Sequence, residues 1–423
     1  MAKLIVNNSG PLHGEVLISG AKNAVLPLMA ATLLTDEACI IDGVPDLADV
    51  KVMKGMLENF GATVKDDGHG LLEIQASEIK TVQGDRDLVT EMRASTVAMG
   101  PLLARCGKVI MPLPGGCAIG KRPIDLHLKG FKALGADVVE DYGNEQVIIT
   151  AGDEGLIGDA IYLDFPSVGA TENILMASTM AAGTTIIENA AKEPEIVDLA
   201  NQLNKMGAKI KGAGTDTIRV TGVKKMGGSI HSVIPDRIET GTFMLAAAIT
   251  RGDVLVKNAL PGHVRPIIAK LKECGVEVDV VDDGIYVDAR DRELIATNIK
   301  TLPYPGFPTD IQSPFMAFLT TVKGSSEVKE TVFENRFMHV NELNRMGADI
   351  SVENRVAYIP GGKKLHGATV RATDLRAGAA MIIAGLAAEG KTEVSDIYHI
   401  ERGYEKFVEK FAGLGATLTR VED

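Results

Sequence analysis

The chain has 423 residues, of which 45% are hydrophobic and 24% charged, and it carries a formal net charge of −12 at pH 7. This length exceeds the range over which one hydrophobic core keeps growing, so a soluble globular protein of two domains is expected. The negative charge argues against nucleic acid or a membrane surface as a partner, because either would favour a basic face.

The N-terminus, MAKLIVNNSG, lacks the apolar stretch of a signal peptide, and no apolar run approaches the roughly 18 residues of a transmembrane helix. The four cysteines, Cys39, Cys106, Cys117 and Cys274, show neither CxxC pairing nor a His at zinc-finger spacing. A structural metal site is therefore not expected. Scattered cysteines in a large acidic protein suit a reducing compartment, so the sequence predicts a cytoplasmic protein.

Two kinds of helical segment alternate along the chain. The first is an amphipathic helix that ends in Gly and runs into a short strand, as in MLENFGATV and FKALGADVV. Its six glycines are spaced by 74, 72, 68, 72 and 68 residues, at Gly61, Gly135, Gly207, Gly275, Gly347 and Gly415. Each stands where a helix C-terminus needs a left-handed residue, and the residues behind it begin a strand. The spacing predicts six structural repeats of roughly 70 residues.

The second kind of segment is rich in Ala, Met, Leu and Gly and almost uncharged, as in ENILMASTMAAG and TGTFMLAAAIT. Helices that are apolar all round are buried, so each repeat should carry one buried helix, one half-exposed helix and several strands. Three repeats per domain would give an α/β (α+β) fold with the buried helices inside and sheets around them. The KKMGG stretch at 224–228, between the third and fourth repeats, is the natural boundary between the two domains. The alternative is a continuous solenoid, although solenoid repeats usually run about 20–50 residues.

Several predicted buried helices begin at charged or capping side chains. Helix N-termini offer unpaired N–H groups and the positive end of a dipole, so they attract anions. Ser and Asp at these positions can also be ordinary N-caps, but capping does not account for Lys or Arg there. If the helix starts converge at one end of each domain, a cleft between the domains would be an anion site. The residues concerned are Lys22 with Asn23, Arg93, Ser167, Asp310, Asp374 and Arg376.

The stretch 114–123, PGGCAIGKRP, contains two prolines and three glycines and is predicted to be a loop. Cys117 lies at its centre beside Lys121 and Arg122, and nearby cations favour the reactive thiolate. Cys117 is therefore the predicted functional cysteine, whereas the other three are predicted to be inert core residues. His127 follows the loop and could act as a base or bond the loop or a substrate.

Over nearly its whole length the sequence resembles the UDP-N-acetylglucosamine 1-carboxyvinyltransferases, the UDP-N-acetylglucosamine enolpyruvyl transferases of the EPSP synthase superfamily. The matching stretches are SGAKNAVLPLMAA, RAST, PGGCAIGKRPIDLHL, SVGATENILMA, AAKEPEIVDLA, PDRIETGTF, FPTDIQ, TVFENRFMHVNEL, ATDLRAGAA and YHIERGYE. The resemblance implies two inside-out α/β barrel domains of three repeats each, with the active site in the cleft between them. The first domain would span 22–229, and the N-terminal strand would join the second, giving 1–21 and 230–423.

The resemblance also implies a reaction. The enolpyruvyl group of phosphoenolpyruvate would move to the 3′-hydroxyl of UDP-N-acetylglucosamine, releasing phosphate, in the first committed step of peptidoglycan synthesis and without a metal or cofactor. Cys117 would be the general acid and Asp310 is the best candidate for the base, although the assignment of each proton transfer stays open. A phosphonate epoxide, which mimics phosphoenolpyruvate, is expected to inhibit by covalent addition to Cys117.

Binding roles carry over motif by motif. Lys22, Arg122 and Arg402 would hold the phosphate and carboxylate of phosphoenolpyruvate, with Asn23 close by. The UDP-sugar site would be lined by Arg93, Arg122, Pro123, Ile124, Asp125, Leu126, Ser167, Val168, Gly169, Asp310 and Val332. Further substrate contacts are expected from Arg336, Asp374 and Arg376.

One position departs from the family pattern. Members often carry Lys two residues before the Ser-Val-Gly turn, where this chain has Phe165, which puts one phosphate or uridine contact in doubt. Two alternatives follow. The shikimate-pathway enolpyruvyl transferases resemble the chain in fold but lack the Cys loop and the RPIDL run. A catalytically silent nucleotide-sugar sensor of the same fold has only Phe165 in its favour.

Overall fold

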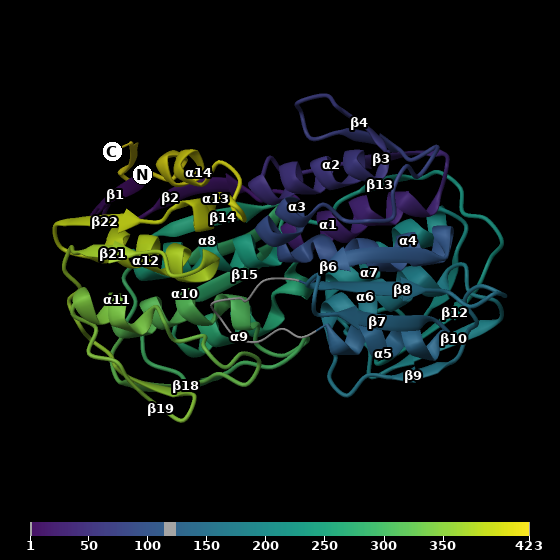
Figure 1. Ribbon diagram of the computed structural model, residues 1–423. Helices are drawn as coiled ribbons and strands as arrows, with labels where there is room; N and C mark the ends of the chain where they lie inside the picture. Colours follow the sequence, from purple (N-terminus) through teal and green to yellow (C-terminus); the bar gives the residue numbers. More distant parts are fainter. Residues whose placement is uncertain (1, 114–123, 423) are drawn as a thin grey trace. The chain divides into compact units, whose positions relative to one another are not determined.

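The computed structural model describes residues 2–113 and 124–422. The predicted site positions Cys117, Lys121, Arg122 and Pro123 lie outside the described residues. The described chain is a mixed α/β fold that divides into two compact units (Figure 1). We call residues 20–113 with 124–234 the first unit, and residues 2–19 with 235–422 the second unit.

Three sheets form the described part of the first unit. One has the order β13 (Ile230–Ser232), β3 (Ala38–Asp42), β5 (Leu72–Gln75), β4 (Thr63–Asp66). Another has the order β11 (Lys209–Lys211), β12 (Thr217–Thr221), β10 (Thr184–Glu188), β9 (Ala160–Tyr162). The third comprises β6 (Lys108–Pro112), β8 (Gln146–Thr150) and β7 (Asp137–Asp141). Because β13 pairs in parallel with β3, residues 230–232 lie in this unit.

The second unit repeats this plan. One sheet has the order β15 (Glu277–Val281), β16 (Gly284–Asp288), β14 (Asp253–Lys257), β2 (His13–Leu17). Another has the order β17 (Ile299–Lys300), β18 (Ser325–Lys329), β20 (Val356–Pro360), β19 (Ser351–Glu353). The third has the order β21 (Thr369–Arg371), β22 (Lys391–Ser395), β1 (Lys3–Asn7), β23 (Leu418–Val421). Each four-stranded sheet of either unit has a parallel pair at one edge and antiparallel pairs elsewhere. The N-terminal strands β1 and β2 pair with strands from the C-terminal half of the chain.

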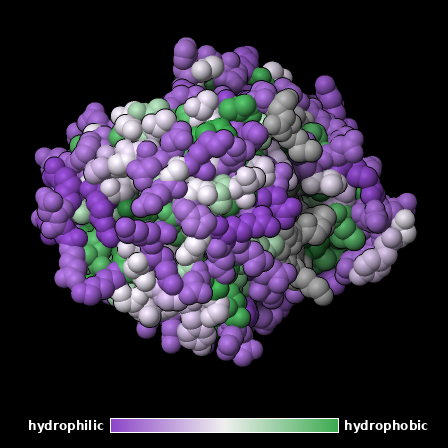
Figure 2. Space-filling view, turned by 90° about the vertical axis from the view of Figure 1, so that its left-hand side faces the viewer, coloured by the Kyte–Doolittle hydropathy of each residue, from purple (hydrophilic) through white to green (hydrophobic). Residues whose placement is uncertain are grey.

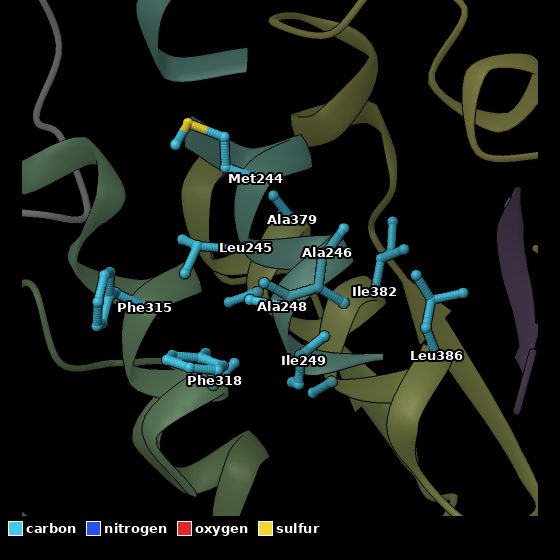
Figure 3. Close-up of a cluster of buried hydrophobic side chains, with 14 of the residues drawn as sticks. Met244, Leu245, Ala246, Ala248, Ile249, Phe315, Phe318, Ala379, Ile382 and Leu386 are labelled. Atoms are coloured by element: carbon cyan, nitrogen blue, oxygen red, sulfur yellow. The ribbon is translucent and has the colours of Figure 1, made fainter. Parts of the chain in front are cut away.

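The uncharged helices are buried, as predicted. Those of the first unit are α1 (Lys22–Ala31), α4 (Met99–Cys106) with the preceding 3-10 helix η2 (Arg93–Ala98), and α6 (Val168–Ser178). Those of the second unit are α8 (Arg237–Ile249), α10 (Thr309–Thr320) and α12 (Leu375–Ala387), which pack against one another. Figure 3 shows Leu245, Phe315, Phe318 and Ile382 meeting in the core that these three helices share. Apolar surface all round each helix leaves no face suited to water, so burial follows.

The amphipathic helices of the repeats are α2 (Ala48–Phe60), α5 (Asp125–Ala133), α7 (Pro194–Lys205), α9 (Arg265–Glu273), α11 (Val340–Arg345) and α14 (Phe407–Gly413). All six repeat glycines follow these helices closely and have φ between 86° and 108°. The left-handed conformation at each helix end, and with it the sixfold repeat, is confirmed. The short helices are η1 (Thr32–Leu34), α3 (Arg86–Glu91), η3 (Pro261–His263) and α13 (Tyr398–Glu401).

The surface agrees with the charged composition, since the face drawn in Figure 2 is mostly hydrophilic with scattered apolar residues. Among the described residues, no helix combines the length and apolar character needed to cross a membrane. Cys39 and Cys274 are buried as predicted, but Cys106 is exposed. The core prediction for Cys106 was wrong because this residue is the last of α4, where the helix ends at Gly107 with φ 69° and turns toward solvent.

Candidate active site

Lys22 begins α1, and a buried carboxylate already matches its charge. Its Nζ lies 2.6 Å from Oδ2 of Asp49, in the first turn of α2, and the two side chains keep 13% and 4% of their exposure. A cation at the positive end of a helix dipole is unfavourable by itself. Asp49 therefore already neutralises the charge of Lys22, whereas the sequence predicted that only a bound anion would do so. No motif singled out Asp49. Asn23, next to Lys22, is exposed.

The start of α6 is a second place where an anion would be stabilised. Ser167 caps the helix, with its Oγ accepting the N–H of Ala170 at 3.3 Å. Val168 and Gly169 follow and are partly exposed. Within the described structure the first turn carries no acidic residue. The positive end of the helix dipole is thus not matched by an acidic side chain of its own first turn, an arrangement that suits a phosphate.

A carboxyl one turn further into α6 does not alter this conclusion. Glu172 is buried, and burial together with the nearby charges of Glu195 and Glu193 raises the pKa of its carboxyl well above the usual value. A raised pKa favours the neutral acid, which brings no negative charge toward the helix start. Phe165, two residues before Ser167, is 44% exposed, so it places an apolar ring where the family often has a cation.

Three predicted binding segments meet around a buried amide in the first unit. Nδ2 of Asn173, in α6, lies 2.9 Å from Nδ1 of His127, in α5. The same Nδ2 donates to the carbonyl oxygen of Thr96 at 3.0 Å, and Oδ1 accepts the N–H of Gly100 at 2.7 Å. These bonds join η2, α4, α5 and α6. Arg93 begins η2, while Ile124, Asp125 and Leu126 stand at the start of α5; the side chain of Arg93 is outside the described part.

In the second unit, Asp310 holds two buried guanidinium groups. It lies in the first turn of α10, where Oδ1 is 2.8 Å from Nη2 of Arg336 and Oδ2 is 3.1 Å from Nε of Arg376. The arginine side chains are 4% and 3% exposed, against 25% for Asp310. Burial alone would lower the pKa of Arg376, but the charges of Asp310, Tyr404 and Asp236 raise it above its usual range. The predicted base thus lies between two permanent cations.

Of the other predicted residues of this unit, two make hydrogen bonds within the protein and one is partly exposed to solvent. Asp374 caps α12, its Oδ1 accepting the N–H groups of Arg376 at 2.8 Å and Ala377 at 3.1 Å, so the capping alternative holds for that oxygen. The N–H of Val332 donates to Oε1 of Glu330 at 2.8 Å. Arg402 follows α13 and is partly exposed.

Glu330 is a residue that the sequence argument missed. It is 2% exposed, and its Oε2 accepts the hydroxyl of Thr309, the first residue of α10, at 2.9 Å. Through its two oxygens it ties the start of α10, and hence Asp310, to the segment that carries Val332. A lone Glu directly after a strand gives no local signal of this role.

Comparison with known proteins decides the family. A model for EPSP synthase (3-phosphoshikimate 1-carboxyvinyltransferase) matches residues 6–411. The chain belongs to the EPSP synthase family. Within that family, it is 57% identical over 418 residues to UDP-N-acetylglucosamine 1-carboxyvinyltransferase 1 of Caldanaerobacter subterraneus subsp. tengcongensis, covering 99% of each chain. It is 51% identical to the protein of the same name from Staphylococcus aureus (strain N315), covering 100% of each chain.

Solved structures of other proteins share the fold. The enolpyruvyl transferase NikO from Streptomyces tendae matches with a TM-score of 0.87 at 25% identity, over 99% of this chain and 98% of that chain. An EPSP synthase from Acinetobacter baumannii matches with a TM-score of 0.79 at 18% identity over 100% of both chains. The mixed α/β architecture predicted from the repeats is confirmed.

Proposed function

We propose that this protein transfers the enolpyruvyl group of phosphoenolpyruvate to the 3′-hydroxyl of UDP-N-acetylglucosamine and releases phosphate. The observation that carries the proposal is the identity of 51% and 57% over essentially full length to relatives named for this activity. The reaction would be the first committed step of peptidoglycan synthesis and would take place in the cytoplasm.

The charges of the first unit suit the two anionic substrates. Lys22 would meet the phosphate of phosphoenolpyruvate, with Asp49 fixing the direction of its Nζ at 2.6 Å. Arg122 and Arg402 would complete this site by resemblance. The capped start of α6 at Ser167 would receive the diphosphate of the sugar nucleotide, whose charge complements the helix dipole.

The chemistry requires one acid and one base. Phosphoenolpyruvate becomes electrophilic at C2 once C3 takes a proton, which we assign to Cys117. The sugar 3′-oxygen then bonds to C2, and its proton passes to Asp310. In the second half, C3 gives up a proton to the Cys117 thiolate, the bond from C2 to the phosphate oxygen breaks, the double bond forms again, and the departing phosphate takes the proton from Asp310. Cations near the departing phosphate stabilise its charge.

The pairing of Asp310 with two guanidinium groups bears on its role as base. A carboxylate so held is a poor proton acceptor, because nearby positive charge favours the ionised form. We infer that an anionic group of the bound substrate draws Arg336 or Arg376 toward itself and releases one oxygen of Asp310. The negative charge of the substrate would then favour proton transfer to that oxygen.

A phosphate-release assay tests the proposal. With phosphoenolpyruvate and UDP-N-acetylglucosamine together we expect turnover, and with either alone none. Replacing the sugar nucleotide by shikimate 3-phosphate tests the shikimate-pathway alternative. Binding of UDP-N-acetylglucosamine without phosphate release would favour the silent sensor and overturn the proposed activity.

A further inference from the structure

The orientation of the Asn173 amide is fixed by the backbone around it. Asn173 is 0% exposed. Its Oδ1 accepts a backbone N–H, from Gly100 at 2.7 Å, and its Nδ2 donates to a backbone carbonyl, from Thr96 at 3.0 Å. An amide nitrogen has two hydrogens and accepts nothing. With the amide so oriented, the second hydrogen of Nδ2 points to Nδ1 of His127, 2.9 Å away.

This contact determines the tautomer of His127. Nδ1 faces a donor, so it must be the accepting nitrogen and carry no proton. The neutral ring then carries its proton on Nε2. In an imidazolium, Nδ1 would also carry a proton, and this proton would face the amide hydrogens of Asn173. The hydrogen bond between Asn173 and His127 would then be lost. The buried amide therefore selects one of three possible proton arrangements of the ring.

The protonated edge of the ring lies beside the start of α6. A Cβ placed on Gly169 would be 3.2 Å from Cε1 and 3.5 Å from Nε2 of His127. The helix that carries Asn173, α6, packs closely against both α4 and α5. A Cβ on Gly100 would come within 2.3 Å of the carbonyl oxygen of Asn173, and one on Gly130 within 2.2 Å of Ile174.

We propose that Asn173 is a positioning residue for the UDP-sugar site, and that it holds His127 as a neutral Nε2–H donor toward the diphosphate at the start of α6. The inference rests on the proposed function, because it assumes that a nucleoside diphosphate sugar binds at Ser167 to Gly169. A fixed neutral donor adds a directed hydrogen bond to the helix N–H groups. Its pre-set proton spares the site the cost of reorienting the ring when ligand arrives.

The first experiment is Asn173→Asp. The carboxylate keeps the size of the amide and can still accept from Gly100, but it faces the carbonyl of Thr96 and can only accept from His127. The neutral ring must then carry its proton on Nδ1, which leaves Nε2 without a hydrogen to donate. We expect ¹⁵N spectra of histidine-labelled protein to show the proton on Nε2 in the parent and on Nδ1 in the variant.

Binding supplies the functional readout. Loss of one hydrogen bond to a charged ligand group should weaken binding of UDP-N-acetylglucosamine by about 10- to 100-fold in calorimetry. The KM of phosphoenolpyruvate should stay within about twofold, because a positioning residue of the sugar-nucleotide site does not touch it. A purely structural role would instead lower the melting temperature without this selectivity.

Asn204→Asp is the matched control. The side chain of Asn204, near the end of α7 in the same unit, accepts the N–H of Ile210 at 2.9 Å and donates to its carbonyl at 3.2 Å. It undergoes the same chemical change, and we expect no effect on nucleotide-sugar affinity. Equal losses in both variants would overturn the proposal.

His127→Phe guards against misfolding of the Asn173 variant, since it keeps a ring but removes both nitrogens. It should lose the same affinity, and the double variant should lose no more than either single one. Unchanged affinity in His127→Phe, or a parent ring protonated on Nδ1, would refute the inference. Failure of the parent to bind UDP-N-acetylglucosamine would refute the proposed function instead, while the spectra of the parent would still report the tautomer.

Discussion

Replacing Asp310 by Asn should separate the chemical role of this carboxylate from its structural one. The Asn oxygen can still accept from one arginine, but its NH2 group would face the other guanidinium, now 2.8 Å or 3.1 Å away. Removing one partner of a buried ion pair typically costs about 3–5 kcal/mol, because the remaining charge stays buried. The side chain of Asp310 is 25% exposed, so water can reach the site and we expect the lower end, about 3 kcal/mol.

Three measurements follow for Asp310→Asn. Thermal unfolding should show a melting temperature lower by roughly 6–12 °C, at about 2–4 °C per kcal/mol for units of this size. Phosphate release should fall by about 10²–10⁴-fold, the usual loss when a general base is removed. The affinity for UDP-N-acetylglucosamine, measured by calorimetry, should decrease only modestly. Turnover within about twofold of the parent would refute the assignment of Asp310 as the base.

Glu330→Gln is the control for destabilisation. Glu330 is also a buried carboxylate near the start of α10, and it accepts the hydroxyls of Thr301 and Thr309, both at 2.9 Å. Its amide should lower stability by about 1–3 kcal/mol, because one accepting oxygen becomes a donor. We expect its kcat to fall far less than that of Asp310→Asn, since Glu330 helps to position the start of α10 but has no part in the proposed proton transfers. If Glu330→Gln lost as much turnover as Asp310→Asn, the loss of turnover would be explained by the loss of stability. The assignment of Asp310 as the base would then be refuted.

Three further predictions concern other sites, each with its own measurement. A general thiol reagent should label exposed Cys106 in the folded protein but spare Cys274, because burial raises the pKa of that thiol to about 12; peptide mapping by mass spectrometry decides this. Burial lowers the pKa of His339 from 6.5 to about 4, so the folded state binds fewer protons than the unfolded state. Stability should therefore fall as pH drops from 6.5 toward 4, by up to about 3 kcal/mol, and denaturant titrations of His339→Gln should show a flatter profile. Glu172 should give the opposite pH dependence: burial raises the pKa of its carboxyl, so stability is lost as the pH rises above the pKa of the unfolded state. Glu172→Gln, which mimics the neutral acid, should therefore unfold at a higher denaturant concentration than the parent at pH 8 but not at pH 4.

The repeat architecture could be predicted because its signals are local. Each repeat glycine ends a helix within one or two residues, and the required left-handed conformation belongs to that position alone. The composition of the buried helices is equally local, and it gave their burial correctly. Cys106 shows what composition does not predict, because an apolar run does not indicate which residue at the end of its helix is exposed to solvent. The domain limits at 22 and 229 remain a prediction.

The partners of the functional cations could not be predicted in the same way. Asp49 lies 27 positions after Lys22, and Asp310 lies 66 positions before Arg376. Each pair is brought together only by packing between separate helices, so no spacing within one helix or strand reveals it. The tautomer of His127 is a similar case, since it depends on Asn173 from another helix and on two backbone groups that fix the amide.

These pairs change how anion binding should be understood. The sequence suggested bare cations at helix starts, waiting for a ligand to neutralise them. The structure shows Lys22 and Arg376 already balanced by carboxylates within their own units. An arriving anion must therefore compete with Asp49 or Asp310, which weakens its binding but leaves a carboxylate with less positive charge around it. At Asp310 this exchange acts in the direction that the chemistry needs, because a carboxylate that loses a guanidinium and gains a neighbouring anion accepts a proton more readily. Substrate binding would thus prepare the base, and the ion pairs would keep it inactive until then.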